Sequence, residues 1–423
     1  MSADNNHKVR TLWLSGVLHA FTHLYQMALV PLYLLIQRDL KLDGVEQATL
    51  LVTVMGFTYF LPSYPMGVLA DRVSRKKLLA IGLALNGLGF VLLGFSPNYA
   101  CALLSVALAG FGGSFYHPAA TALVARLYPT NTGKALGLTA IGASVGFCVS
   151  PIYAGWRAEM TGNWRYPVVE LGVMGIICSV IFYLLAAEEP VVPVAAKTKT
   201  SGKKLFPTKA LWIFFLMAAF AFSLRDFAGM GMGSLGSLFL QKAHGFNAQT
   251  TGFILSGIFL ASAVSNPLFG HLSDRGRIRW AIALLLLATV MIAIFPHVSK
   301  AWMFVVLSAY GFFFLASYPV VEAALMESVP DAVRGRVFGL FITCGGLLGN
   351  ISHWAVGAMV KNLGPKAVIA SNYYSLYGWL AVAVVLSMAG LPCLHAIRNR
   401  EKLKGHVLPV VIPSAVAPES PLQ

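Results

Sequence analysis

The chain has few charged residues for its length. Of its 423 residues, 11% are Asp, Glu, Lys or Arg and 57% are hydrophobic, whereas a soluble domain carries about 25% charged residues. Negatively charged residues are scarcer than positively charged ones, with 16 Asp and Glu against 31 Lys and Arg. This composition excludes an ordinary soluble domain and favours a chain that lies mostly inside a lipid bilayer.

Several catalytic and metal-binding signatures are also missing. The five cysteines show no paired spacing, so neither a disulfide framework nor a zinc site is expected from them. The sequence has no Gly-x4-Gly-Lys-Ser/Thr loop and no His-Glu-x-x-His, which argues against ATP-driven work and against a zinc hydrolase. We therefore expect no enzyme, no cofactor and no resident metal ion.

Long apolar runs fill most of the sequence. A helix that crosses a bilayer needs about 20 apolar residues, and we expect about twelve such segments. Their approximate ranges are 11–36, 48–70, 78–95, 99–127, 135–157, 165–187, 210–240, 248–270, 279–296, 301–328, 335–360 and 373–397. The prediction is an all-α, multi-pass membrane protein with twelve transmembrane helices.

The basic residues are distributed unevenly between the two sides of these spans. With the N-terminus placed in the cytoplasm, 22 of the 31 Lys and Arg residues fall in inner loops and tails, and 8 fall in outer loops. Cytoplasmic loops of membrane proteins carry this excess of Lys and Arg. We therefore expect both termini in the cytoplasm, and we attribute the net charge of +15 to membrane topology, with no nucleic-acid partner.

Two motifs occur twice, about 200 residues apart. Residues 67–77 place an Asp-Arg pair before a basic cluster, and residues 270–279 repeat this arrangement. Tyr116-His117-Pro118 likewise recurs as Ser317-Tyr318-Pro319. Internal repeats are typical of transporters that expose a site near the bilayer midplane to each side in turn. The predicted organisation is a six-helix half at 1–187, a polar cytoplasmic linker at 188–209, a second half at 210–397 and a cytoplasmic tail at 398–423.

The duplicated charged turns resemble the loop signature of the major facilitator superfamily, which places it after the second and eighth spans. One departure is Ser74, where the family usually has Gly. The resemblance covers essentially the whole chain and implies the major facilitator fold, alternating access and a monomer. It also implies that residues of the two turns act in gating, to which we add an acidic residue at the inner end of the tenth span. The expected gating residues are Asp71, Arg72, Arg75, Asp274, Arg275 and Glu327.

A second resemblance narrows the class. Residues 18–26 (LHAFTHLYQ), 112–118 (GGSFYHP) and 327–330 (ESVP) look like the fosmidomycin-resistance branch of the superfamily. That branch implies export of antibiotic-like compounds in exchange for protons across a bacterial inner membrane. His23 stands where the branch commonly carries an acidic residue. In the fifth span, Gly142, Gly146 and Ser150-Pro151 are similar to the Gly/Pro pattern of superfamily antiporters; such glycines permit close helix contact, and proline bends a helix.

Ionisable side chains at membrane depth are costly, so each is a candidate for function. His19, His23 and Gln26 share one face of the first span, and histidine can take up and release protons near neutral pH. The structural alternative is a neutral core histidine bonded to a neighbouring helix. His117 precedes Pro118, and the proline frees a backbone carbonyl that a side chain or substrate could use.

Arg225 and Asp226 lie near the centre of the seventh span. Adjacent helical residues point in different directions, so we expect each to find its partner on another helix or on a substrate, with Glu322 as the candidate partner of Arg225. A structural ion pair is the alternative. The expected substrate- and proton-binding residues are His19, His23, Gln26, Tyr116, His117, Arg225, Asp226, Tyr318 and Glu322.

These features predict a secondary active transporter, with proton-coupled efflux of a small amphipathic compound such as an antibiotic. Arg225 and the three histidines outnumber the central acids, which favours an anion. Two alternatives stay open. One is a proton-coupled importer of an organic acid or nutrient. The other is a divalent-metal exporter with His19, His23, Asp226 and Glu322 as ligands.

Overall fold

The computed structural model describes residues 3–188, 205–330 and 333–403. All regular structure in these ranges is helical, which confirms the predicted all-α class. Most of the expected linker, at 189–204, and most of the expected tail, at 404–423, lie outside the described residues.

The described residues up to 188 form nine α-helices. They are α1 (Ala3–Ala28), α2 (Tyr33–Asp39), α3 (Val45–Phe60), α4 (Ser63–Ala70), α5 (Arg75–Gly94), α6 (Tyr99–Gly113), α7 (Tyr116–Leu127), α8 (Thr132–Thr161) and α9 (Arg165–Leu185). The described residues after 204 add α10 (Lys209–Leu238), α11 (Ala248–Leu260), α12 (Ser262–Leu272), α13 (Arg277–Ile294), α14 (Met303–Ser328), α15 (Arg334–Asn362), α16 (Tyr374–Ser387) and α17 (Gly390–Leu403).

Ten stretches of the described chain are long and apolar enough to cross a membrane, and they match the third to twelfth expected spans. The first two expected spans are helical as well, but each is interrupted at a proline. A 3-10 turn, Val30–Leu32, separates α1 from α2, and Leu61 and Pro62 separate α3 from α4. Proline has no backbone N–H to donate, so it favours such breaks. The arrangement is consistent with twelve spans.

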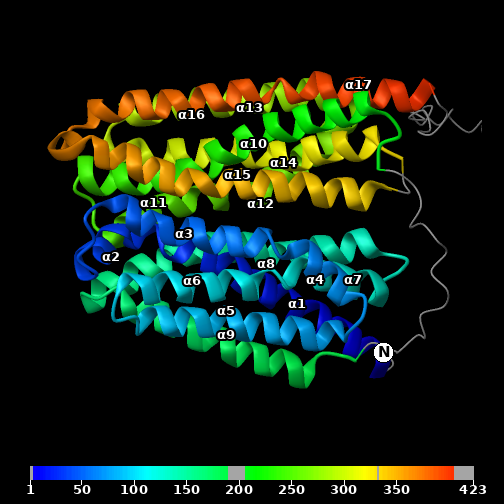
Figure 1. The fold of residues 1–423 in the computed structure, drawn as a ribbon, viewed down its shortest axis with the longest axis horizontal. Helices are drawn as coiled ribbons and strands as arrows, with labels where there is room; N and C mark the ends of the chain where they lie inside the picture. Colours follow the sequence, from blue (N-terminus) through cyan, green and yellow to red (C-terminus); the bar gives the residue numbers. More distant parts are fainter. Residues whose placement is uncertain (1–2, 189–204, 331–332, 404–423) are drawn as a thin grey trace, which may run out of the picture.

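The helices lie in two groups. Helices α1–α9 form the blue-to-green group in Figure 1, and α10–α17 form the green-to-red group. α1 begins and α17 ends at the same end of the bundle (Figure 1). The groups meet mainly where α8 packs on α11 and α3 packs on α15.

The two groups are in close contact at the end of the bundle away from the chain ends. A Cβ atom added to Gly252 of α11 would overlap the carbonyl oxygen of Pro151 on α8. Across the α3–α15 contact, Thr53 Oγ1 donates to the carbonyl of Asn350 at 2.8 Å, and Lys361 Nζ lies 2.6 Å from Glu46 Oε1. Backbones that approach this closely need small residues at the contact.

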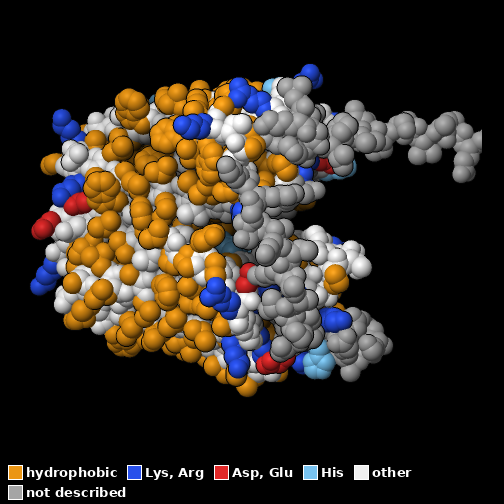
Figure 2. All heavy atoms as spheres, turned by 45° about the vertical axis from the view of Figure 1, so that its right-hand side comes forward, with side chains coloured by type: hydrophobic (Ala, Val, Ile, Leu, Met, Phe, Trp, Pro, Cys, Tyr) orange, Lys and Arg blue, Asp and Glu red, His pale blue; other side chains and the backbone are white. Residues whose placement is uncertain are grey.

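The other end of the bundle is open. Figure 2 shows the molecule hollowed between the two groups on the side where the described chain ends lie. On the flanking helices, the side chain of Tyr64 on α4 is 75% exposed and that of Val264 on α12 is 63% exposed. With the predicted topology, this hollow faces the cytoplasm. The face of the molecule seen in Figure 2 carries many hydrophobic side chains over both groups of helices, as expected of a surface in contact with lipid.

Candidate functional site

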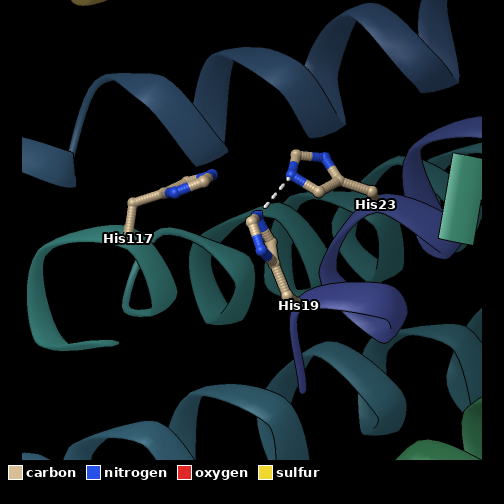
Figure 3. Close-up of side chains that lie close together, drawn as sticks. All are labelled: His19, His23 and His117. Atoms are coloured by element: carbon tan, nitrogen blue, oxygen red, sulfur yellow. Dashed lines mark hydrogen bonds between the residues drawn. The ribbon is translucent and has the colours of Figure 1, made fainter. Parts of the chain in front are cut away.

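Three histidines from two helices of the first group lie together. His19 and His23 belong to α1 and His117 to α7, and one ring nitrogen from each lies within 4.8 Å of the others. Figure 3 shows the rings converging on one point. Nε2 of His19 and Nε2 of His23 are 3.1 Å apart. His19 is largely buried, whereas His117 is exposed, so the cluster is reached by solvent.

The rings of His19 and His23 are held in place by their neighbours. Nδ1 of His19 lies 2.9 Å from the carbonyl oxygen of Thr139 on α8, and Nδ1 of His23 lies 3.1 Å from Oε1 of Gln26. His19 stacks on Tyr116, with ring centroids 4.6 Å apart. The predicted face of α1 therefore brings His19, His23 and Gln26 together as expected, and α7 adds His117 and Tyr116.

The glycines of α8 determine how closely α1 approaches. A Cβ atom on Gly142 would overlap the carbonyl oxygen of Gly16, and one on Gly146 would overlap that of Ala20. One turn further, Ser150 Oγ donates to the carbonyl of Leu24 at 2.5 Å. The small-residue motif is thus the surface on which the histidine-bearing helix packs. α8 continues as a helix through Pro151.

The second group holds a polar cluster of its own on α10 and α14. Arg225 donates to Oδ1 of Asp226 from Nε at 3.1 Å and from Nη2 at 2.9 Å. Its guanidinium carbon lies 3.8 Å from the centroid of the Tyr318 ring, a cation–π contact. Arg225 is 1% exposed. The cluster therefore contains a buried ion pair stacked on an aromatic ring.

This pair corrects the sequence-based expectation that adjacent residues would not neutralise each other. The Cα–Cβ bonds of two adjacent helical residues point in different directions. The arginine side chain is nevertheless long enough for its guanidinium to reach the carboxylate of the next residue. Asp226 in turn packs against α15, where a Cβ atom on Gly345 would overlap Oδ2 of Asp226. Arg225 therefore forms its direct ion pair on its own helix. The opposite charge of Glu322, the expected partner, lies close enough to attract Arg225, but within the described residues the two side chains form no ion pair.

Glu322 is the acid of this cluster that forms no direct ion pair within the described residues. It follows Tyr318 by one turn of α14, so the two side chains share a helix face. It is half-buried, and within the described residues its carboxylate has no hydrogen bond or ion pair. A carboxylate at this depth without a partner is unusual in a membrane bundle.

The two clusters occupy corresponding places in the repeat. His117 and Tyr318 each directly precede the repeated proline, on α7 and α14. The metal-ligand set proposed from the sequence is not assembled, because the described residues bring His19 and His23 to His117 rather than to Asp226 and Glu322.

Phe147 is a site residue that the sequence did not indicate. Its ring stacks on His23 with centroids 4.3 Å apart and on Phe259 of α11 with centroids 4.8 Å apart. It therefore joins the histidine cluster to the second group of helices. One phenylalanine in an apolar helix carries no signal that distinguishes it from its neighbours, so only the packing identifies it.

The expected gating residues lie at the open end. Asp274 lies 3.0 Å from Arg277, and Arg277 also pairs with Glu327 of α14. Arg398 lies 3.6 Å from the same glutamate. Neither Arg277 nor Arg398 was among the gating residues expected from the sequence. In the first group Arg75 lies 3.8 Å from Asp71, while Arg72 and Arg275 are exposed.

Comparisons with known proteins agree with this architecture. A family model described as the Major Facilitator Superfamily matches residues 12–353. The multidrug resistance protein MdtG of Proteus mirabilis is 28% identical over 330 residues, which cover 74% of this chain and 80% of that protein. The quinolone resistance protein NorA of Staphylococcus aureus (strain COL) is 24% identical over 386 residues, covering 89% of this chain and 92% of that protein.

Among solved structures, a bacterial homologue of the human lysosomal transporter Spinster is similar in its inward-facing, unoccupied conformation. The TM-score is 0.76 at 18% identity, over 97% of this chain and all of that one. The nucleoside transporter NupG (D323A mutant) gives a TM-score of 0.69 at 17% identity, over 92% of this chain and 99% of that one. At these identities the similarity concerns the fold.

Proposed function

Because the chain belongs to the Major Facilitator Superfamily and is therefore a multi-pass membrane transport protein and not an enzyme, we propose that it exports small amphipathic drug-like compounds in exchange for protons. The names of its relatives support this choice, since they are multidrug and quinolone resistance proteins. Transport proceeds by alternating access, and the hollow is the substrate path in its inward-open form.

The substrate binds between the two polar clusters. Histidines of α1 and α7 form one wall, and the Arg225–Asp226 pair with Tyr318 and Glu322 forms the other. The stacked rings of Phe147 and Phe259 offer an apolar surface for the hydrophobic part of an amphipathic molecule. The preference for an anion rested on Arg225 and the three histidines, which outnumber the central acids. Since the charge of Arg225, the one permanent cation of that set, is paired with Asp226, we propose a neutral or cationic substrate.

Glu322 is the residue that we assign to proton coupling. The observation that carries the proposal is that its half-buried carboxylate forms no hydrogen bond or ion pair within the described residues, while Arg225, the nearby cation, is bound to Asp226. An unpaired ionised carboxylate is unfavourable in the bundle, so it binds either a proton or a positive group of the substrate. These two ligands exclude each other at one carboxylate. Entry of a proton then releases the substrate, which is the exchange that an antiporter requires.

Drug accumulation in a bacterial host that lacks its own efflux pumps tests this function. Cells that express the protein should hold less of an amphipathic fluorescent dye than cells without it. Glu322→Gln keeps the shape of the side chain but removes its charge, and it should abolish the difference. Glu159→Gln makes the same chemical change at an exposed site and should leave export intact. Equal export by both variants would contradict the assignment of Glu322.

Further proposals concern the setting of the protein. We place it in a bacterial inner membrane with both termini in the cytoplasm, and we propose a monomer with protons as the coupling ion. Segments 18–26 and 112–118 support membership of the fosmidomycin-resistance-like branch. The gating roles of Asp71, Asp274 and Glu327 are proposed from their position at the open end.

A further inference from the structure

The hydrogen bonds around His19 and His23 determine which ring nitrogens carry hydrogen. Nδ1 of His19 faces a backbone carbonyl oxygen, and Nδ1 of His23 faces the side-chain oxygen of Gln26. Both oxygens accept hydrogen bonds and cannot donate them. With the oxygen of Gln26 facing His23, Nδ1 is the nitrogen that donates in each ring, and in a neutral imidazole Nε2 is then left with a lone pair.

The two Nε2 atoms are directed at each other, 3.1 Å apart. Two lone pairs at this separation repel unless a cation lies between or beside them. His117 brings a third imidazole to the same point, within 4.8 Å, and its ring edge faces the pair (Figure 3). The cluster contains three nitrogen donors and, within the described residues, no carboxylate that could serve as a fourth ligand.

Such an arrangement has the features of a transition-metal site. Metal-binding histidines usually donate their second N–H to a carbonyl or similar acceptor, which fixes the ring, and both His19 and His23 do so. Around a tetrahedral zinc ion with Zn–N bonds of about 2.0–2.1 Å, the nitrogens lie about 3.3 Å apart. The His19–His23 separation of 3.1 Å already has this value within a few tenths of an ångström, and His117 brings a third ring nitrogen within 4.8 Å of the other two.

We propose that His19, His23 and His117 bind one divalent transition-metal ion of the zinc class, with a fourth coordination position open to the hollow. Imidazole ligands suit Zn²⁺, Ni²⁺ and Cu²⁺ and disfavour Mg²⁺ and Ca²⁺. Because α1 and α7 belong to the same group of helices, the ion does not bridge the two groups. This inference concerns binding alone, so it holds or fails independently of the proposed efflux.

Cobalt titration of the purified full-length protein, freed of any histidine tag and stripped of metal, tests the site. Co²⁺ held by three histidines in four- or five-coordinate geometry absorbs visible light through d–d transitions, and hexaaquo Co²⁺ absorbs far more weakly. We expect an absorption that saturates at one Co²⁺ per chain, that Zn²⁺ removes, and that excess Mg²⁺ leaves unchanged. Absence of the absorption would overturn the proposal, including the case in which the pair merely shares a proton.

The Co²⁺ affinities of single-residue variants test whether the ion binds at the three histidines. His117→Ala should weaken Co²⁺ binding at least tenfold, and His117→Gln, which keeps a polar side chain of similar size, should do the same. Gln26→Ala removes a positioning residue and should weaken binding about 10–100-fold while keeping the shape of the spectrum. His297→Ala, at an exposed histidine outside the cluster, should bind as the unmodified protein does. Equal loss in His297→Ala, or none in both His117 variants, would contradict the assignment.

Discussion

Nη2 of Arg225 lies 2.9 Å from Oδ1 of Asp226, the next residue of the same helix. This pair binds the cation at the centre of the second group of helices to Asp226, and within the described residues the carboxylate of Glu322 forms no direct ion pair. The second group therefore combines a buried ion pair with a separate acid, to which we assign proton coupling.

The stability of the protein should depend on both members of this pair. Arg225→Ala leaves Asp226 as an unpaired charge and should cost about 3–5 kcal/mol, seen as a lower melting temperature of the detergent-solubilised protein. The double variant Arg225→Met/Asp226→Leu removes both charges and should recover most of that loss. A double variant less stable than Arg225→Ala would show that the pair is not the source of the effect.

The close contact between α8 and α1 should be required for the histidine cluster. Gly146→Val would force α1 away, because a Cβ atom there overlaps the backbone of Ala20, and overpacking of this kind costs about 1–3 kcal/mol. We expect loss of export and a lower melting temperature. Gly137→Val, the same change on the same helix where a Cβ atom meets nothing within 4 Å, should be tolerated. Export unaffected by Gly146→Val would show that the α1–α8 contact is not needed.

The equilibrium between inward- and outward-open forms should respond to Gly252. Gly252→Val disrupts the closed end, since a Cβ atom there overlaps the carbonyl of Pro151, and it should shift the population towards the outward-open form. Spin labels on Tyr64→Cys and Val264→Cys, in a chain without its native cysteines, should then move closer together across the hollow. Gly270→Val, at a position with open space around it, should leave the distance distribution unchanged, and no change in either variant would contradict the gating role of the closed end.

Binding of drug-like compounds should depend on the aromatic bridge, which is the stack formed by the rings of His23, Phe147 and Phe259. Phe147→Ala removes the ring that stacks on both His23 and Phe259 and should weaken the affinity for a fluorescent amphipathic substrate about tenfold, in line with the 1–3 kcal/mol of a large buried apolar contact. Phe147→Tyr keeps the ring and should bind almost normally. Fluorescence titration of the purified variants measures both, and equal affinity in the two would rule the bridge out as a binding surface.

The sequence predicted the helices well because the length and apolar composition of a membrane span can be read directly from the residues. It also identified most of the polar residues of the two clusters, since a histidine or an aspartate stands out in an apolar run. It could pair His19 with His23 through helical spacing, but the approach of His117 depends on how α7 packs against α1.

The length of the arginine side chain explains why the sequence did not predict the pairing of Arg225 with Asp226. Helical periodicity describes where Cβ atoms point, and Arg225 is long enough to depart from it. Phe147 and Arg398 gain their roles only from partners that are distant in sequence, so no local pattern could have indicated them. Arg277 lies in the repeated charged turn, three residues after Asp274, but its pairing with Glu327 depends on how α13 packs against α14.

The most direct test of proton-coupled export through Glu322 is a measurement of proton movement in proteoliposomes. Vesicles containing the purified protein and a trapped pH-sensitive dye would be challenged with an amphipathic cationic substrate. We predict that addition of the substrate causes proton movement in the direction opposite to the substrate. This proton movement should be lost in Glu322→Gln and retained in Glu159→Gln. Substrate transport without proton movement, or proton coupling that survives in Glu322→Gln, would contradict proton-coupled antiport through Glu322.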